Sequence, residues 1–283
     1  MKLGAVVVVF NPEEDVVDNI SSYAQWCDYV IIWDNSPSPI FNMDSESLKL
    51  TMSIPDHIPF QYVSDGSNYG LAHAYNCAID IFRNYGCTHL MTMDQDSRFE
   101  NFVTFRKRVE MLEKEKYILA PVINSFCDDT QNELISANDV AQSGCVHPLS
   151  MIDEVGLFRE DFFIGMVDVE MQLKAVEKGY RVFQIGGCNM IHQIGSGRTV
   201  NWCGKIIHLS DYGPLRHYYD SRNRILMWKE FPYDISFHGK IKHLIGRLSL
   251  CIKIFLFEDR KFAKIISIIR GTFNGLFNII KPY

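Results

Sequence analysis

The feature that most constrains the fold is a recurrence of short apolar runs, rich in β-branched residues, that alternate with segments of helical character. The runs cover residues 5–10, 29–33, 90–93 and 118–122, and the helical segments include residues 12–26 and 71–85. This alternation is typical of βαβ units with parallel strands. The sequence therefore predicts an α/β fold, and 283 residues suffice to bury a substantial core.

Glycine-rich phosphate loops are missing from the sequence. No Gly-x-Gly-x-x-Gly follows the first apolar run, and no Gly-x-x-x-x-Gly-Lys-Ser/Thr occurs anywhere. A phosphate-bearing ligand would therefore have to be neutralised by a metal ion or by Arg and Lys side chains. The scattered cysteines form no Cys-x-x-Cys pair, which favours reduced thiols and a cytoplasmic location.

Two carboxylates, Asp94 and Asp96, directly follow the apolar run at residues 90–93. Residues two apart project to the same side of a strand, so this pair can share a hard cation such as Mg²⁺ or Mn²⁺. The alternative is a strand-end turn, in which Asp commonly bonds its own backbone. His192 is either a third metal or diphosphate contact or a structural histidine.

Polar residues follow the first two runs as well. Asp34 and Asn35 suit a pyrimidine base, whose imide offers an N–H donor and carbonyl acceptors, although a plain turn fits the same residues. Asn11 and Pro12 are expected to line the same pocket. In parallel sheets the ligand crevice lies outside the carboxyl ends of the strands, where all these residues are predicted.

Several motifs in fixed order carry a resemblance to a known family. They are residues 6–12, 34–36, 68–76 and 94–97, Gly144, residues 155–158 and 162–163, Asp168-x-Glu170 with Gly179-Tyr180, and Tyr219 with Arg222-Asn223. Over roughly residues 4–230 the chain resembles the family 2 glycosyltransferases, and within them the bacterial rhamnosyltransferases. The resemblance implies a GT-A fold, a Rossmann-like mixed sheet flanked by helices, here with a C-terminal helical extension.

The resemblance also implies roles for the acidic residues. Asp94 is expected near the ribose and the metal, Asp96 as the direct metal ligand, and Asp168 as the general base with Glu170 in support. The family often has an acidic pair here, of which Asp168 corresponds to the second acid, while this chain has Val167 in place of the first. The alternative for Asp168 and Glu170 is that they only favour the start of a helix, where the helix dipole stabilises negative charge.

Other substrate contacts are expected from loops and basic residues. The resemblance places the loop with Asn68, Gly70 and Asn76 against the nucleotide sugar; the alternative is a loop and helix start without function. Arg222 can grip a phosphate through two N–H groups, and Arg198, in a Gly/Ser-rich loop, could close over the diphosphate.

Residues 240–283 hold nine Lys and Arg residues against two acids, mixed with many apolar residues. This pattern predicts basic amphipathic helices, which either bind the anionic face of a membrane or cap the protein body through their apolar side. No run reaches the roughly 18 apolar residues of a spanning helix. We expect a transferase domain at residues 1–230, with halves at 1–125 and 126–230, and a helical tail at 231–283.

The predicted function is metal-dependent, inverting transfer of a sugar from a nucleoside diphosphate donor to a saccharide or lipid-linked saccharide. The resemblance favours dTDP-rhamnose and a bacterial surface polysaccharide such as O-antigen or capsule. The alternatives are another donor, UDP-galactose or UDP-glucose, and a non-catalytic nucleotide- or carbohydrate-binding protein. No nucleic-acid partner is expected.

Overall fold

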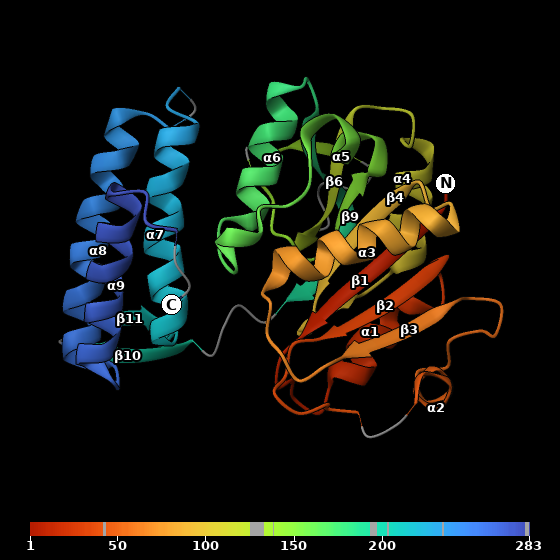
Figure 1. Ribbon diagram of the computed structural model, residues 1–283, viewed down its shortest axis with the longest axis horizontal. Coiled ribbons are helices and arrows are strands. Elements are labelled where there is room, and N and C mark those ends of the chain that lie inside the picture. The colour runs from red at the N-terminus through yellow and green to blue at the C-terminus, as the bar shows by residue number, and fades with distance from the viewer. Residues whose placement is uncertain are drawn as a thin grey trace. The chain divides into compact units, whose positions relative to one another are not determined.

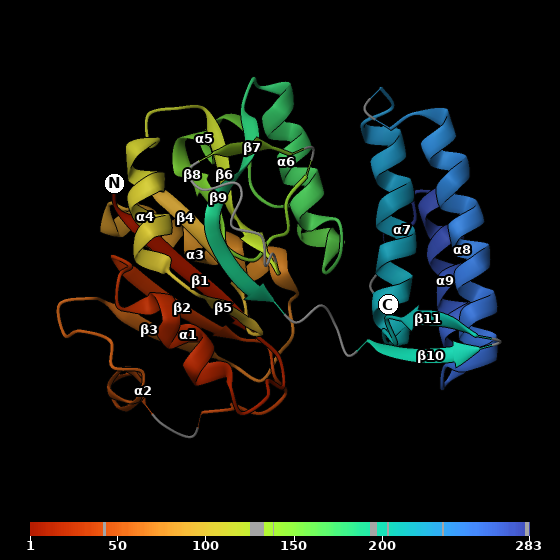
Figure 2. The same ribbon diagram turned by 180° about the vertical axis from the view of Figure 1, so that it is seen from behind.

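The computed structural model describes residues 1–41, 44–124, 133–137, 139–192, 197–202, 204–233, 235–280 and 283. They form two compact units (Figures 1 and 2). The first unit comprises Met1–Glu160 and Asp168–His192, and the second comprises Asp161–Val167 and Gln193–Tyr283.

The first unit is built on a mixed sheet. Its strands are β1 (Leu3–Val9), β2 (Tyr29–Asp34), β3 (Phe60–Ser64), β4 (His89–Asp94), β5 (Ser97–Phe99), β6 (Tyr117–Ile123), β7 (Leu134–Ser136), β8 (Cys145–Pro148) and β9 (Arg181–His192). The order is β3-β2-β1-β4-β8-β6-β9-β5, with β7 paired to β9. The first four strands of this order are parallel, whereas β8 runs antiparallel to β4 and β6. The predicted α/β fold is confirmed.

Helices cover both faces of this sheet. They are α1 (Val16–Ala24), α2 (Ser45–Thr51), α3 (Leu71–Tyr85), α4 (Phe102–Met111), α5 (Leu149–Val155) and α6 (Val167–Glu177), with a 3₁₀ turn at Glu160–Phe162. Figure 1 shows α3 in front of the sheet, and Figure 2 shows α1 and α4 in front of the opposite face. The close approach of α3 needs Gly4 in β1, because a Cβ atom there would lie 2.6 Å from the Phe82 ring.

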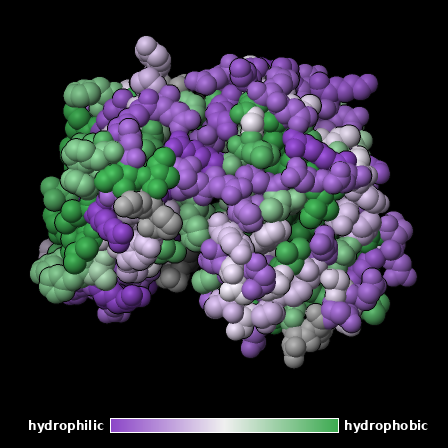
Figure 3. All heavy atoms as spheres, viewed as in Figure 1, coloured by the Kyte–Doolittle hydropathy of each residue, from purple (hydrophilic) through white to green (hydrophobic). Residues whose placement is uncertain are grey.

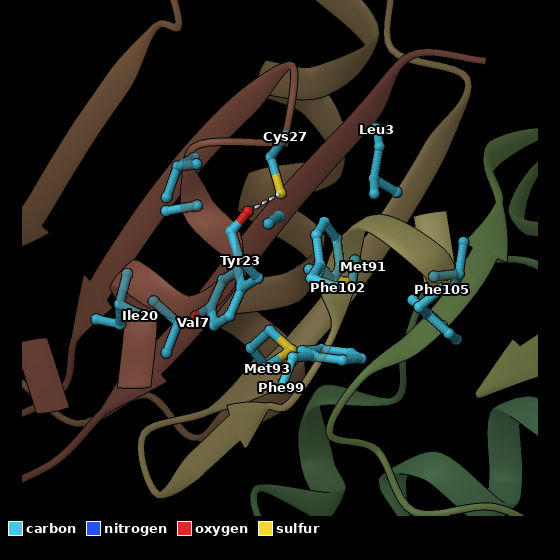
Figure 4. Close-up of a cluster of buried hydrophobic side chains, with 14 of the residues drawn as sticks. Leu3, Val7, Ile20, Tyr23, Cys27, Met91, Met93, Phe99, Phe102 and Phe105 are labelled. Carbon is cyan, nitrogen blue, oxygen red and sulfur yellow. Dashed lines mark hydrogen bonds between the residues drawn. The ribbon is translucent and has the colours of Figure 1, made fainter. Parts of the chain in front are cut away.

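The core beneath α1 and α4 is aromatic and sulfur-rich (Figure 4). Tyr23 from α1 packs against Phe102 from α4, with ring centroids 6.1 Å apart. Met91 and Met93, on alternate positions of β4, point to this same side. This packing buries β4 as far as Met93, the residue before Asp94.

The second unit combines a hairpin with three long helices. Its elements are β10 (Arg198–Trp202), β11 (Lys205–Leu209), α7 (Pro214–Glu230), α8 (Phe237–Phe257) and α9 (Lys261–Leu276). A Cβ atom on Gly271 would lie 2.2 Å from the carbonyl oxygen of Tyr218, so α9 lies directly on the backbone of α7. By its contacts, α7 thus belongs to the same compact unit as α8 and α9, and the predicted domain boundary at residue 230 stays a prediction.

Apolar side chains gather on the surface of the α8 and α9 helices, at the left of Figure 3. Among the described residues, no helix has the length and apolar character needed to cross a membrane.

Candidate active site

The predicted polar residues after β1, β2 and β4 meet at one edge of the sheet. In the parallel register Val9 lies opposite Asp34, and Val8 lies opposite Asp94. The backbone N–H of Asn11 donates to Ser36 Oγ at 2.8 Å, which joins the loops after β1 and β2. The carboxyl ends of these strands therefore form a shared polar edge, as the sequence predicted.

Asp94, Asp96 and His192 form a cluster that could hold a metal ion. Each offers one ligand atom, and these atoms all lie within 4.8 Å of one another. His192 Nδ1 is 3.2 Å from Asp96 Oδ1. The antiparallel pairing of β5 with β9 sets Ser97 opposite His192, and so brings the histidine beside residues far away in sequence.

Two buried serines, Ser97 and Ser143, hold this cluster in place through hydrogen bonds. Neither was predicted as a site residue from the sequence. Ser143 Oγ accepts the backbone N–H of Asp94 at 3.0 Å and donates to Ser97 Oγ at 2.6 Å. Ser97 Oγ in turn lies 2.8 Å from His192 Nδ1. The sequence signals were positions in the motifs that carry the resemblance: Ser97 ends the motif at residues 94–97, and Ser143 lies beside Gly144.

Asp168 and Glu170 lie in the first turn of α6. Glu170 is buried and pairs with Lys174 at 3.3 Å, and Lys174 also donates to the carbonyl of Leu157 at 3.1 Å. Burial raises the pKa of the Tyr75 hydroxyl well above its usual range, and the carboxylates of Asp94 and Asp168 raise it further. Tyr75 is therefore within electrostatic reach of both the metal-ligand candidate and the base candidate.

Asp34 is almost completely buried and organises the loop that follows it. Its Oδ1 accepts the N–H of Ser36 at 2.8 Å, and its Oδ2 accepts the N–H of Ile40 at 3.0 Å and the hydroxyl of Tyr62 at 2.5 Å. The neighbouring Asn35 donates to the carbonyl of Gly70 at 3.2 Å. Pro12, half-buried, lies in the turn after β1.

The loop before α3 brings Asn68 and Gly70 to the same edge. Asn68 Oδ1 accepts the N–H of Gly70 at 3.0 Å, and Gly70 has a φ of 83°, which favours glycine. Asn76 instead faces inward: its Nδ2 donates to the carbonyl of Phe158 and to Glu160 Oε1, both at 2.9 Å. Its Oδ1 accepts the N–H of Phe158 at 3.0 Å.

The two arginine candidates belong to the second unit and make contacts there. Arg222, only 1% exposed, donates to the carbonyl of Asp161 and stacks its guanidinium over Tyr219, 4.8 Å from the ring centroid. Arg198 was expected in a loop but begins β10, where its Nε lies 3.2 Å from Asp211 Oδ2. Their roles toward a diphosphate stay predictions.

Comparison with known proteins agrees with this geometry. No family model matches the chain. A dTDP-rhamnosyl transferase, RfbF of Shigella flexneri, is 26% identical over 247 residues, which cover 80% of this chain and 79% of RfbF. GalNAc-T7, solved with UDP, GalNAc and Mn²⁺, superposes with a TM-score of 0.54 at 11% identity, covering 68% of this chain and 43% of GalNAc-T7.

A second solved structure, residues 1–349 of S. aureus TarS in complex with UDP-GlcNAc, superposes with a TM-score of 0.51 at 10% identity. The superposition covers 98% of this chain and 92% of that one. This chain is a glycosyltransferase with the GT-A fold. The predicted fold and the resemblance to the family 2 rhamnosyltransferases are confirmed.

Proposed function

We propose that this GT-A glycosyltransferase transfers rhamnose from dTDP-rhamnose to a saccharide or lipid-linked saccharide, with inversion, in the synthesis of a bacterial surface polysaccharide such as O-antigen or capsule. The observation that carries the proposal is the cluster of Asp94, Asp96 and His192 at the carboxyl end of β4. The similarity to RfbF supports rhamnose as the donor sugar.

The proposed cofactor is Mn²⁺ or Mg²⁺. Two carboxylates and one imidazole fit such an ion, since carboxylate oxygens are the ligands that both metals prefer. When bound, the ion would offset the negative charge that develops on the departing diphosphate.

Asp168 is the proposed general base. Its carboxylate would take the proton of the acceptor hydroxyl, whose oxygen forms a bond to the anomeric carbon as the bond from that carbon to the diphosphate breaks. Attack from the face opposite the leaving group inverts the anomeric configuration and needs no covalent enzyme intermediate. Glu170, buried and paired with Lys174, would support the helix that carries the base.

Asp34 is the residue proposed to recognise the pyrimidine base. A carboxylate offers roughly four acceptor positions. Ser36, Ile40 and Tyr62 use three of them, two on Oδ2 and one on Oδ1. The remaining position on Oδ1 suits the imide N–H, which thymine and uracil share, so a UDP-sugar is the alternative donor.

The first test is a thermal-shift panel of dTDP-rhamnose, dTDP, UDP-glucose and UDP-galactose, with and without Mn²⁺, because a ligand that binds only the folded state raises Tm. We expect metal-dependent stabilisation by dTDP-rhamnose that Asp96→Asn abolishes. A preference for UDP-sugars would replace the donor, and the UDP-bound structural neighbours make this the leading alternative. No shift with any nucleotide would favour a non-catalytic protein.

We also propose that the second unit holds the enzyme at the cytoplasmic face of an anionic membrane. Large apolar side chains are exposed at helical spacing along α8 and α9, among them Ile245, Leu248, Phe262, Ile266 and Ile269. This part of the chain carries nine basic residues against two acidic ones, and of those two, Glu258 is buried against Lys264. Apolar burial combined with positive charge favours anionic lipid.

Flotation of the full chain with vesicles of phosphatidylglycerol and phosphatidylcholine tests this proposal. We expect flotation that salt weakens and that Leu248→Glu with Ile266→Glu abolishes. Met111→Glu, at an even more exposed apolar position on α4, is the control and should float like the wild type. Equal flotation of all three proteins, or none at all, would contradict membrane binding.

A further inference from the structure

Two buried glutamines in the first unit differ in how their amides are used. Gln172, 1% exposed on α6, donates from Nε2 to the carbonyl of Val140 at 2.8 Å and accepts the N–H of Val140 at Oε1 at 2.9 Å. Gln142 is 7% exposed, yet within the described part of the chain neither its Oε1 nor its Nε2 has a hydrogen-bond partner. A buried amide with no partner is unfavourable and needs an explanation.

The backbone around Gln142 is firmly held. The carbonyl of Gln142 accepts Thr92 Oγ1 at 2.7 Å and the N–H of Cys145 at 3.2 Å. The next residue, Ser143, accepts the N–H of Asp94. Two residues earlier, Val140 is bonded to the amide of Gln172, which joins this segment to α6. Gln172 lies four positions after Asp168 on that helix. Gln142 is therefore fixed between the strand end that carries Asp94 and the helix that carries Asp168.

A second unpartnered polar group lies in the same region. Tyr75 is fully buried, and its hydroxyl likewise has no hydrogen-bond partner among the residues described. Both Asp94 and Asp168 act on this hydroxyl electrostatically. The Tyr75 hydroxyl is thus a buried polar group within electrostatic reach of both carboxylates, and the backbone of Gln142 is bonded to the strand that ends at one of them, Asp94.

We propose that Gln142, with Tyr75, recognises hydroxyl groups of a sugar bound in the active site. An amide presents one acceptor and one pair of donors side by side, which complements neighbouring hydroxyls on a sugar ring. Because its backbone is held in place and its amide has no partner among the described residues, the amide is free to bond a ligand. The inference rests on the proposed function and adds the residues that select the sugar, which belongs either to the donor or to the acceptor.

The test compares Gln142→Leu with wild type in Tm and in binding. Because the amide has no partner in the described part of the chain, we expect Gln142→Leu to keep or raise Tm. For donor recognition, the Kd for dTDP-rhamnose rises about tenfold, the loss of roughly two neutral hydrogen bonds, while the Kd for dTDP stays unchanged. For acceptor recognition, the KM for the saccharide acceptor rises about tenfold instead. Tyr75→Phe should act in the same direction.

Gln172→Leu is the matched control, because it removes an equally buried glutamine whose amide is fully used, and it should lower Tm. If Gln142→Leu lowers Tm as much as Gln172→Leu, or leaves sugar binding and acceptor KM at wild-type values, the inference is overturned. If wild-type protein binds neither dTDP-rhamnose nor UDP-glucose, the proposed function is wrong, and the inference, which rests on it, is wrong as well.

Discussion

Replacement of Ser143 by Ala tests whether the serine pair holds the proposed metal site. Ser143 is fully buried, and the substitution leaves the N–H of Asp94 without its acceptor and Ser97 without its donor. A buried polar group left unpaired costs about 1–3 kcal/mol, so we expect a loss of about 2 kcal/mol in the free energy of unfolding. For a unit of this size that corresponds to a fall in Tm of about 4–8 °C.

The same variant should weaken metal binding, because Ser97 orients His192 and Ser143 holds the backbone of Asp94. Outer partners of metal ligands typically contribute 10- to 100-fold in affinity, and we expect a loss of about tenfold. Electron paramagnetic resonance of free Mn²⁺ measures this affinity directly, without turnover. Ser38→Ala, at an exposed serine, is the control. Wild-type Tm and wild-type Mn²⁺ affinity in Ser143→Ala would refute the reasoning.

Three further predictions concern the base, a buried histidine and the packing of the second unit. Asp168→Asn should lower kcat by about 10²- to 10⁴-fold while donor binding, measured by calorimetry, stays near wild type; retained turnover would exclude Asp168 as the base. Burial lowers the pKa of His147 from 6.5 to about 3, so the folded state stays neutral while the unfolded state takes up a proton below about pH 6.5. Stability is therefore lost as the pH falls, and urea unfolding at pH 7 and pH 5 should show that His147→Leu removes about 2 kcal/mol of that loss; an unchanged pH dependence would contradict this assignment. Gly271→Ala should destabilise the protein by about 1–3 kcal/mol, because its Cβ would overlap the carbonyl of Tyr218. Gly246→Ala, in a helix with nothing within 4 Å, should instead stabilise it by about 0.5–1 kcal/mol, and equal Tm values for the two variants would count against the described helix contact.

Local patterns were enough to predict the elements that carry the polar edge. The run at residues 90–93 lies within β4, and the segment at 71–85 coincides with α3. Both predictions succeeded because strand and helix periodicity are written in neighbouring residues. The position of Asp94 and Asp96 after a buried strand followed from the same pattern.

The sequence was less informative about contacts between residues that are far apart in the chain. His192 lies beside Asp96 because β5 pairs with β9, and no local sequence pattern predicts that strand pairing. The amide of Asn76 bonds Phe158 and Glu160, contacts that no local pattern indicated, and its predicted role toward the nucleotide sugar stays a prediction. Arg222 was predicted to bind a phosphate through two N–H groups; the structure shows it buried against Tyr219, and its role toward a phosphate stays a prediction.

By itself, the sequence determined the α/β class, the order of the elements and the chemical types gathered at the strand ends, because these depend on periodicity and residue identity. Only the tertiary structure decided which of the polar side chains have hydrogen-bond partners within the protein. It pairs the amide of Gln172 with Val140 and leaves that of Gln142 without a partner among the described residues, although the two side chains are chemically identical. Hydrogen-bond satisfaction is a property of neighbours in space, and those neighbours come from distant parts of the chain.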